Sequence, residues 1–160
     1  MRSDQVDATI RTNFLDIHNE AAAGELQSWR KDARGSLAEI IVLDQFSRNL
    51  YRDTPKAFAQ DGMALVLAQE AIAKGFESEL SAEQEVQFLY LPFMHSESLV
   101  IHERAVELYT ALGQEINLEF EMKHKAIIER FGRYPHRNRI LGRESTQEEI
   151  EFLKGPDSSF

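Results

Sequence analysis

Apolar residues recur every three or four positions along most of the chain, and this spacing constrains the fold more than any other feature. Near the N-terminus, for example, Val6, Ile10, Phe14 and Ile17 occupy one face of a predicted helix. No long segment shows the strict alternation of apolar and polar residues that a half-buried strand requires. The spacing therefore predicts an all-α protein.

Capping residues and prolines divide this pattern into separate helices. Ser36–Glu39 and Ser81–Gln84 have the order of a capping box, in which two side chains bind the free N–H groups at a helix start. Pro92 is expected to stop or kink a helix. The other expected helix starts are Thr54–Pro55, His95–Glu97, Asn117 and Ser145–Glu149. Short links between about six to eight helices favour antiparallel hairpins.

The bulk properties limit the class of protein. With 160 residues, 42% of them hydrophobic, the chain has the length of one domain, so we expect residues 1–160 to form a single helical domain with a flexible tail at 155–160. No apolar run approaches the roughly 18 residues of a membrane span, and the N-terminus has no apolar signal-peptide core. There is no cysteine. These features predict a soluble, cytoplasmic protein that does not associate with a membrane.

Residues 130–143, which we call the arginine segment, concentrate positive charge in an acidic chain. The chain has 18 Lys and Arg against 27 Asp and Glu, a net charge of −9, which argues against general nucleic-acid binding. A local cluster of guanidinium groups still suits bidentate binding of a carboxylate or phosphate. The alternative is that these arginines tie the segment to acidic helices of the protein itself. The arginines are Arg130, Arg133, Arg137, Arg139 and Arg143.

Two further segments carry polar residues suited to a site. Asp44 and Arg48 lie four positions apart at a predicted helix end, where they would share a face. They fit either a plain ion pair or a carboxylate that orients an arginine. His95 and Glu97 follow a helix break, where they could form an acid–base pair beside free N–H groups. The alternative is that Ser96 caps the next helix and Glu97 compensates its dipole.

His102 and His124 lie on apolar stripes, where a histidine is more often a satisfied core residue than a ligand. His124 precedes the arginine segment by one or two turns, which favours a functional role for it. The histidine and glutamate positions match no metal-binding spacing such as His-Glu-x-x-His, and the sequence has neither a phosphate-binding glycine loop nor a nucleophile elbow. The sequence thus predicts no metal and no cofactor.

Three segments together, 43–52, 91–97 and 130–146, resemble the bacterial family catalogued as domain of unknown function 924. The motifs are long and ordered, and the resemblance covers nearly the whole chain. It implies an all-helical, tetratricopeptide-like right-handed α-α superhelix, and it implies no established activity. The positions that match the family pattern are Asp44, Gln45, Arg48, Asn49, Arg52, His95, Ser96, Glu97, His124, Gly132, Arg133, Pro135, His136, Arg137, Asn138, Gly142 and Arg143.

The chain departs from the family pattern in two respects. Family members usually open with an aromatic-rich segment that contains Phe-Trp, whereas this chain begins after it, so a wall of any pocket would be missing. This chain has His102 where the family usually has glutamine, which disfavours a metal-binding role for that histidine.

These observations lead to three hypotheses. In the first, the polar segments converge on a site that binds, or hydrolyses, a small anionic metabolite. The second is a protein-interaction scaffold by fold analogy, with the protein partner unknown. The third is that the motifs only lock the helices together. The predicted ligand-binding residues are Arg48, Asn49, His124, Arg133, Arg137 and Asn138, and the catalytic candidates are His95, Glu97, His136 and Asp44.

Overall fold

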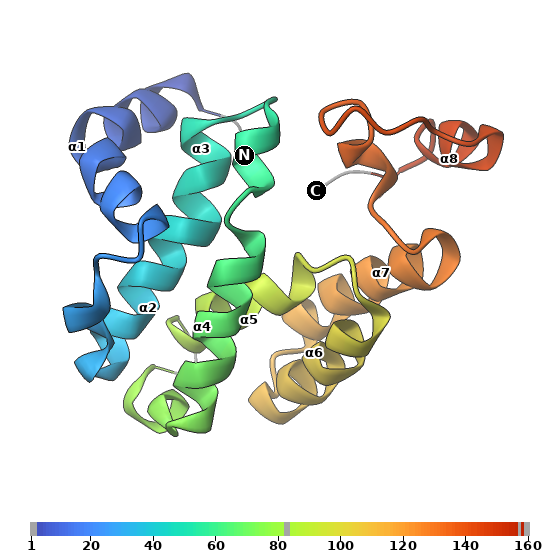
Figure 1. Ribbon diagram of the computed structural model, residues 1–160. Helices are drawn as coiled ribbons and strands as arrows, with labels where there is room; N and C mark the ends of the chain where they lie inside the picture. The colour runs from blue at the N-terminus through green and yellow to red at the C-terminus, as the bar shows by residue number, and fades with distance from the viewer. Residues whose placement is uncertain (1–2, 82–83, 157, 159–160) are drawn as a thin grey trace. The chain divides into compact units, whose positions relative to one another are not determined.

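The computed structural model describes residues 3–81, 84–156 and 158, and shows helices joined by short links (Figure 1). The described residues contain no strand, which confirms the predicted all-α class. Of the short elements, η2 is a π-helix and the other η elements are 3-10 helices. In chain order the elements are α1 (Asp4–Ala22), η1 (Gln27–Lys31), α2 (Ala33–Ile41), η2 (Val42–Phe46), α3 (Ser47–Leu50), η3 (Pro55–Phe58), α4 (Asp61–Ala73), η4 (Phe76–Glu79), α5 (Val86–Met94), α6 (Leu99–Leu112), α7 (Glu115–Phe131), η5 (Pro135–Arg137) and α8 (Gln147–Phe152).

The chain forms two compact units, residues 1–92 and residues 93–160. In the first unit, α2 packs against α4, while α1 packs against η2 and α3. In the second unit, α6 and α7 pack against each other as a helical hairpin joined by Gly113 and Gln114. The predicted superhelix and the predicted single domain concern the whole chain, and both stay predictions.

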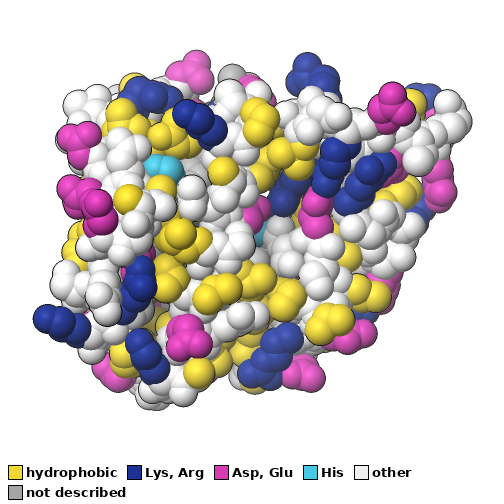
Figure 2. Space-filling view, in the orientation of Figure 1, with side chains coloured by type: hydrophobic (Ala, Val, Ile, Leu, Met, Phe, Trp, Pro, Cys, Tyr) yellow, Lys and Arg dark blue, Asp and Glu magenta, His cyan; other side chains and the backbone are white. Residues whose placement is uncertain are grey.

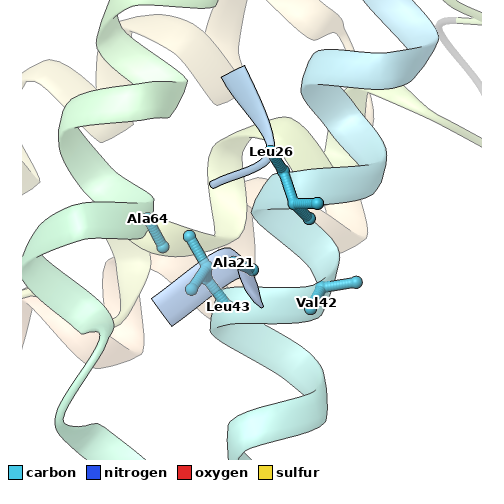
Figure 3. Close-up of a cluster of buried hydrophobic side chains, with 5 residues drawn as sticks. All are labelled: Ala21, Leu26, Val42, Leu43 and Ala64. Carbon is cyan, nitrogen blue, oxygen red and sulfur yellow. The ribbon is translucent and has the colours of Figure 1, made fainter. Parts of the chain in front are cut away.

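Each unit buries an apolar cluster of its own. In the first unit the cluster joins α1, η2 and α4 (Figure 3), and its buried members are Ala21, Leu26, Val42, Leu43 and Ala64. In the second unit Tyr134 packs with Ile127 and Ile128 of α7. This burial fixes the start of the arginine segment against α7, because apolar surface is removed from water there.

Helix α2 begins earlier than the sequence suggested. The carboxylate of Asp32 caps it by accepting a 2.8 Å hydrogen bond from the amide of Gly35. Ser36 is buried inside the helix, and Glu39 accepts two 2.6 Å hydrogen bonds from Arg30 instead of binding the helix start. The predicted capping box at these residues is therefore wrong, because an aspartate closer to the N-terminus supplies the cap.

Gly35 makes a close approach to the preceding segment. A β-carbon at this position would lie 2.0 Å from the carbonyl oxygen of Trp29, far inside a normal contact. Only glycine lets η1 lie against the first turn of α2 in this way.

The boundaries around the predicted helix start at His95–Glu97 also differ from expectation. Helix α5 continues past Pro92 to Met94, so the proline does not stop it. Helix α6 starts only after Ser98, its N-cap residue. Residues 95–97 therefore form a link, and Glu97 is not a residue of the first helical turn.

Other predicted starts had mixed outcomes. Asn117 lies inside the first turn of α7, which has Gln114 at its N-cap position, so the predicted cap is wrong. The predicted capping box at Ser81–Gln84 includes residues 82 and 83, which lie outside the described residues. By contrast, Pro55 opens η3 after Thr54 as predicted.

The C-terminal boundaries agree with the sequence. Gly132 follows α7 with a φ of 66°, a conformation that glycine adopts at low cost. Thr146 caps α8 through a capping box with Glu149. Within the described part of the chain, no helix is both long and apolar enough to cross a membrane.

Candidate functional site

The predicted pair of Asp44 and Arg48 is present in the first unit. Nη1 of Arg48 lies 3.2 Å from Oδ1 of Asp44 and 2.9 Å from Oδ1 of Asp61, which comes from the first turn of α4. Asp44 is buried at the π-helical turn η2, so burial strengthens its interaction with the guanidinium. The contacts of Arg48 therefore tie η2 and α3 to α4. The local sequence did not indicate this link, because Asp61 lies 13 positions from Arg48 and on another helix.

Asn49 and Arg52 both bind Asp7 of α1. The amide of Asn49 donates to Oδ1 of Asp7 at 2.8 Å, and the guanidinium of Arg52 donates to both carboxylate oxygens at 2.8 Å. The side chain of Asn49, a predicted ligand residue, thus contributes to a contact within the first unit. The sequence did not identify Asp7 as the partner of Asn49, because an acid in the first turn of a helix ordinarily compensates the helix dipole.

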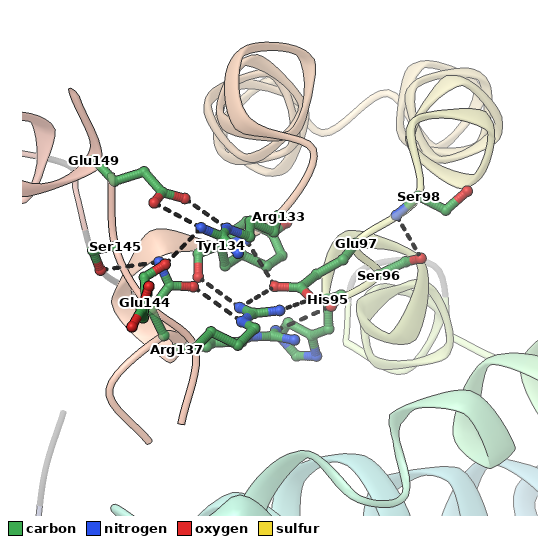
Figure 4. Close-up of polar contacts among 12 residues, drawn as sticks. His95, Ser96, Glu97, Ser98, Arg133, Tyr134, Arg137, Glu144, Ser145 and Glu149 are labelled. Carbon is green, nitrogen blue, oxygen red and sulfur yellow. Dashed lines mark hydrogen bonds and ion pairs between the residues drawn. The ribbon is translucent and has the colours of Figure 1, made fainter. Parts of the chain in front are cut away.

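In the second unit, Glu97 joins the link before α6 to the arginine segment (Figure 4). Its two oxygens accept hydrogen bonds of 2.6 Å and 2.9 Å from Arg143, and the amide of Tyr134 donates to it at 2.7 Å. Burial alone would raise the pKa of Glu97, but the hydrogen bonds from Arg143 and Tyr134 outweigh burial and lower it. Glu97 is therefore held as an ionised anchor.

Arg133 also binds a carboxylate of the second unit. Its guanidinium donates to both oxygens of Glu149 at 2.7 Å and 2.8 Å and to the carbonyl of Glu144 at 2.9 Å. The hydrogen bond from Arg133 lowers the pKa of Glu149 to about 2. Because Glu149 also completes the capping box with Thr146, this arginine fixes the start of α8.

Asn138 is fully buried and its amide is satisfied on both sides. Its nitrogen donates to the hydroxyl of Ser145 at 3.1 Å, and its oxygen accepts from Nε of Arg143 at 3.0 Å. Its predicted role in ligand binding therefore competes with a role in holding the arginine segment in shape.

Tyr134 lies at the centre of the remaining polar residues. Its hydroxyl donates to the carbonyl of Met94 at 2.5 Å. The guanidinium carbon of Arg137 lies 4.6 Å from the ring centroid, and the same guanidinium donates to the carbonyl of His95 at 3.0 Å. The ring of His136 lies 5.5 Å from that of Tyr134, centroid to centroid.

The two histidines on the predicted apolar stripes approach the same tyrosine. The ring centroids of His102 and His124 lie 6.2 Å and 5.8 Å from that of Tyr134. Nδ1 of His102 lies 2.7 Å from Glu121, and Nε2 lies 2.8 Å from the carbonyl of Ser96. His102 is thus a core histidine with partners on both nitrogens, as its position on an apolar stripe suggested.

His124 is neutral in the folded protein. It is buried on α7, and its Nδ1 donates to the carbonyl of Phe120 at 2.7 Å. Burial, together with the nearby imidazoles of His95, His102 and His136, lowers its pKa to about 4 against the effect of the hydrogen bond to Phe120. This places the predicted ligand residue beside the arginine segment, as expected from its sequence position.

Within the second unit, the structure places His124, His136 and Arg137 around Tyr134, and the backbone carbonyl of His95 accepts a hydrogen bond from Arg137. We call these five residues the Tyr134 cluster. Glu97, Arg133 and Asn138 belong to the same sequence motifs, but their side chains make internal contacts that hold the arginine segment in place. Among the described residues, no group of three or more histidine, aspartate or glutamate side chains is arranged to hold a metal ion.

Sequence reasoning missed Glu121 and Tyr134. The spacing of Phe120, His124, Ile127 and Phe131 predicts an apolar stripe through Phe120, yet Phe120 is 46% exposed and Glu121 is fully buried. A glutamate four residues before Lys125 is typical of an exposed helix face, so no local signal identified it. His124 and Ile128, three and seven residues after Glu121, are the positions that place Glu121 on the inward face of α7.

Comparisons with known proteins agree with the motifs. The sequence model of a family described as "Bacterial protein of unknown function (DUF924)" matches residues 1–157. A search of curated proteins gave no match. Among solved structures, the chain is similar to the protein of unknown function ATU0120 from Agrobacterium tumefaciens, with 41% sequence identity and a TM-score of 0.92, over 97% of this chain and 88% of the other. The chain therefore belongs to the bacterial family DUF924.

Proposed function

We propose that the second unit binds a small anion, a carboxylate or a phosphate, at the Tyr134 cluster. The observation that carries the proposal is the concentration of cationic and protonatable groups around one tyrosine ring. The guanidinium of Arg137 and the imidazoles of His102, His124 and His136 all lie within 6.2 Å of it.

The local charge balance favours an anion although the chain is acidic. Glu97 and Arg143 form a pair that is neutral as a unit. Arg137 adds a positive charge beside this pair, and a histidine can gain a second one near neutral pH. In the space-filling view, dark blue Lys or Arg side chains gather over the segment that follows α7 (Figure 2). A local positive field raises the concentration of anions at such a surface.

The contact residues would be Arg137, His95 and His136. Arg137 has the planar fork that binds two oxygens of one carboxylate or phosphate. It is held in place by the ring of Tyr134 and the carbonyl of His95 (Figure 4). His95 and His136 are only half-buried, so part of each side chain is open to solvent, although Nδ1 of His136 is buried. The buried His124 would support the cluster without contacting the ligand.

A titration with inorganic phosphate, pyrophosphate and citrate at constant ionic strength tests the proposal. Backbone amide NMR would report saturable changes at residues 93–97 and 133–138. Arg137→Gln should weaken binding by about 10- to 150-fold, the loss of one charge-assisted hydrogen-bond set. Arg137→Lys keeps the charge without the fork and should bind with intermediate affinity.

Arg130→Gln is the matched control, because Arg130 belongs to the same segment but is exposed and pairs with Glu148. It should bind phosphate as the wild type does. The proposal is wrong if no anion gives a saturable change, or if Arg137→Gln binds as tightly as Arg130→Gln.

A structural role is the second candidate, and the bidentate contacts of Glu97 with Arg143 and of Arg133 with Glu149 favour it. In this case the motif residues serve the fold of the second unit alone. The two candidates predict different behaviour for Arg137→Gln, which changes stability in one case and anion affinity in the other. The scaffold hypothesis stays a prediction from fold analogy.

A further inference from the structure

The buried pair of His102 and Glu121 has a protonation state that its neighbours determine. Nε2 of His102 lies 2.8 Å from the carbonyl oxygen of Ser96, which can only accept a hydrogen bond, so Nε2 carries a proton. Nδ1 lies 2.7 Å from Oε1 of Glu121, and both residues are fully buried. One proton therefore lies between Nδ1 and Oε1.

That proton belongs to the carboxyl group. Oε2 of Glu121 is buried and has no hydrogen-bond partner among the described residues. An ionised carboxylate with a buried, unsatisfied oxygen is costly, whereas the neutral acid loses much less. Burial also raises the pKa of Glu121, against the effects of His102 and Lys125. In this state Glu121 donates to a neutral His102.

A second arrangement is available because the hydroxyl of Tyr134 lies within reach of both possible acceptors. It is 2.5 Å from the carbonyl of Met94 and 3.2 Å from Nε2 of His102. If the pair loses one proton to solvent, the proton that remains can sit on Nδ1 and donate to the Glu121 carboxylate. Nε2 then becomes an acceptor, and Tyr134 can turn its hydroxyl from Met94 to His102.

We propose that His102, Glu121 and Tyr134 form a pH-sensitive hydrogen-bond switch for the link before α6. In the protonated state the pair holds two protons, and the carbonyls of Met94 and Ser96 each accept a hydrogen bond. In the deprotonated state the pair holds one proton, and both carbonyls lose these donors. The switch thus fastens or releases the residues on either side of His95.

Other titratable or charged groups face this switch from each packed element. They are His124 and Lys125 from α7, His95 from the link before α6, and His136 and Arg137 from the segment after α7. The consequence for anion binding rests on the proposed function, because His95 belongs to the Tyr134 cluster. The hydrogen-bond switch itself does not depend on anion binding.

The test is the tautomer of His102, read from its two ring-nitrogen chemical shifts by NMR between about pH 5 and pH 9. The wild type should change from the Nε2–H form to the Nδ1–H form as pH rises. Glu121→Gln should keep the Nε2–H form throughout, because an amide can donate to Nδ1 but cannot lose its proton. Tyr134→Phe removes one hydrogen bond from each state, so it should keep the change of tautomer. The carbonyl carbon of Met94, which loses its donor as pH rises in the wild type, should no longer shift with this transition in Tyr134→Phe.

Glu119→Gln is the control, since Glu119 is an exposed acid on the same helix that pairs with Lys123. It should titrate as the wild type does. A single tautomer of His102 over the whole range in the wild type overturns the proposal, as does an unchanged transition in Glu121→Gln. If Glu121→Gln does not fold, a Met94 carbonyl shift that follows the transition as strongly in Tyr134→Phe as in the wild type overturns it. Arg137→Gln should keep the transition even if it loses phosphate, which separates the switch from the anion site.

Discussion

His124 should make the folded protein lose stability as pH falls, and the size of the effect follows from its surroundings. The side chain is 5% exposed and its pKa is lowered to about 4 by burial and by three neighbouring imidazoles, whereas an unfolded chain has the ordinary value of 6.5. The unfolded state therefore binds a proton first. The stability that the neutral ring contributes is complete above pH 6.5 and is lost as pH falls from 6.5 toward 4.

The loss can be calculated from these two pKa values. Proton linkage gives a decrease of about 2 kcal/mol in the free energy of unfolding between about pH 7.5 and pH 5. This is a large part of the stability of a typical domain, which is about 5–15 kcal/mol. His124→Gln should remove this part of the pH dependence, because glutamine has no proton to gain and can still donate to the carbonyl of Phe120.

Urea unfolding at a series of pH values, for the wild type and for His124→Gln, measures the difference directly. Other titrating groups, including His18, are present in both proteins and cancel in the comparison. NMR titration of the His124 ring gives an independent value for the same pKa. Equal pH slopes for the two proteins, or a ring that titrates near 6.5, would refute the reasoning.

Two further substitutions test the fold. Gly35→Ala should destabilise the first unit by about 1–3 kcal/mol or more in urea unfolding, because the new β-carbon would collide with the carbonyl of Trp29. Gly62→Ala is the control: its β-carbon would meet no atom within 4 Å, so this substitution should change the free energy of unfolding little. Glu149→Gln should be less stable than the wild type at neutral pH, since the bond from Arg133 holds the pKa of Glu149 near 2. That difference should shrink as pH falls from 4.5 toward 2, and a gap that does not change with pH would contradict the role of the ion pair.

Local chemistry accounts for the parts of the fold that the sequence predicted well. A left-handed residue after α7 requires glycine or a close substitute, and Gly132 is there. A capping box needs a hydroxyl and an acid three residues apart, and Thr146 and Glu149 supply them. Such signals fail when two caps compete, as at α2, where the aspartate at position 32 takes the role that was assigned to Ser36.

The partners of the charged residues could not be predicted, because tertiary contacts join residues far apart in the chain. Glu97 and Arg143 are 46 positions apart, and Asn49 and Asp7 are 42 positions apart. Nothing in the local sequence distinguishes Glu97 as an anchor from Glu97 as an acid–base group. The role of Glu97 as an anchor becomes evident only from the hydrogen bonds that Arg143 and the amide of Tyr134 donate to its carboxylate.

The buried face of α7 shows a second limit of sequence reasoning. A shift of one residue, from Phe120 to Glu121, turns the helix by about 100° and exchanges an apolar side chain for an acidic one on the inner face. Burying an acid is unfavourable unless a partner compensates it. That partner, His102, lies on another helix, so the pair becomes visible only when α6 and α7 are packed together.

The arginines of the arginine segment make different kinds of contact. Arg133 and Arg143 each bind both oxygens of an internal carboxylate, which explains why an acidic protein concentrates positive charge here. Those two contacts give the segment a fixed shape. A fixed shape is also what an anion site requires, because a guanidinium that is already oriented loses less entropy on binding. Arg137, held on the ring of Tyr134, is placed by the contacts of its neighbours. The structural role of the internal ion pairs is therefore compatible with the proposed anion site, because those pairs fix the backbone that carries Arg137.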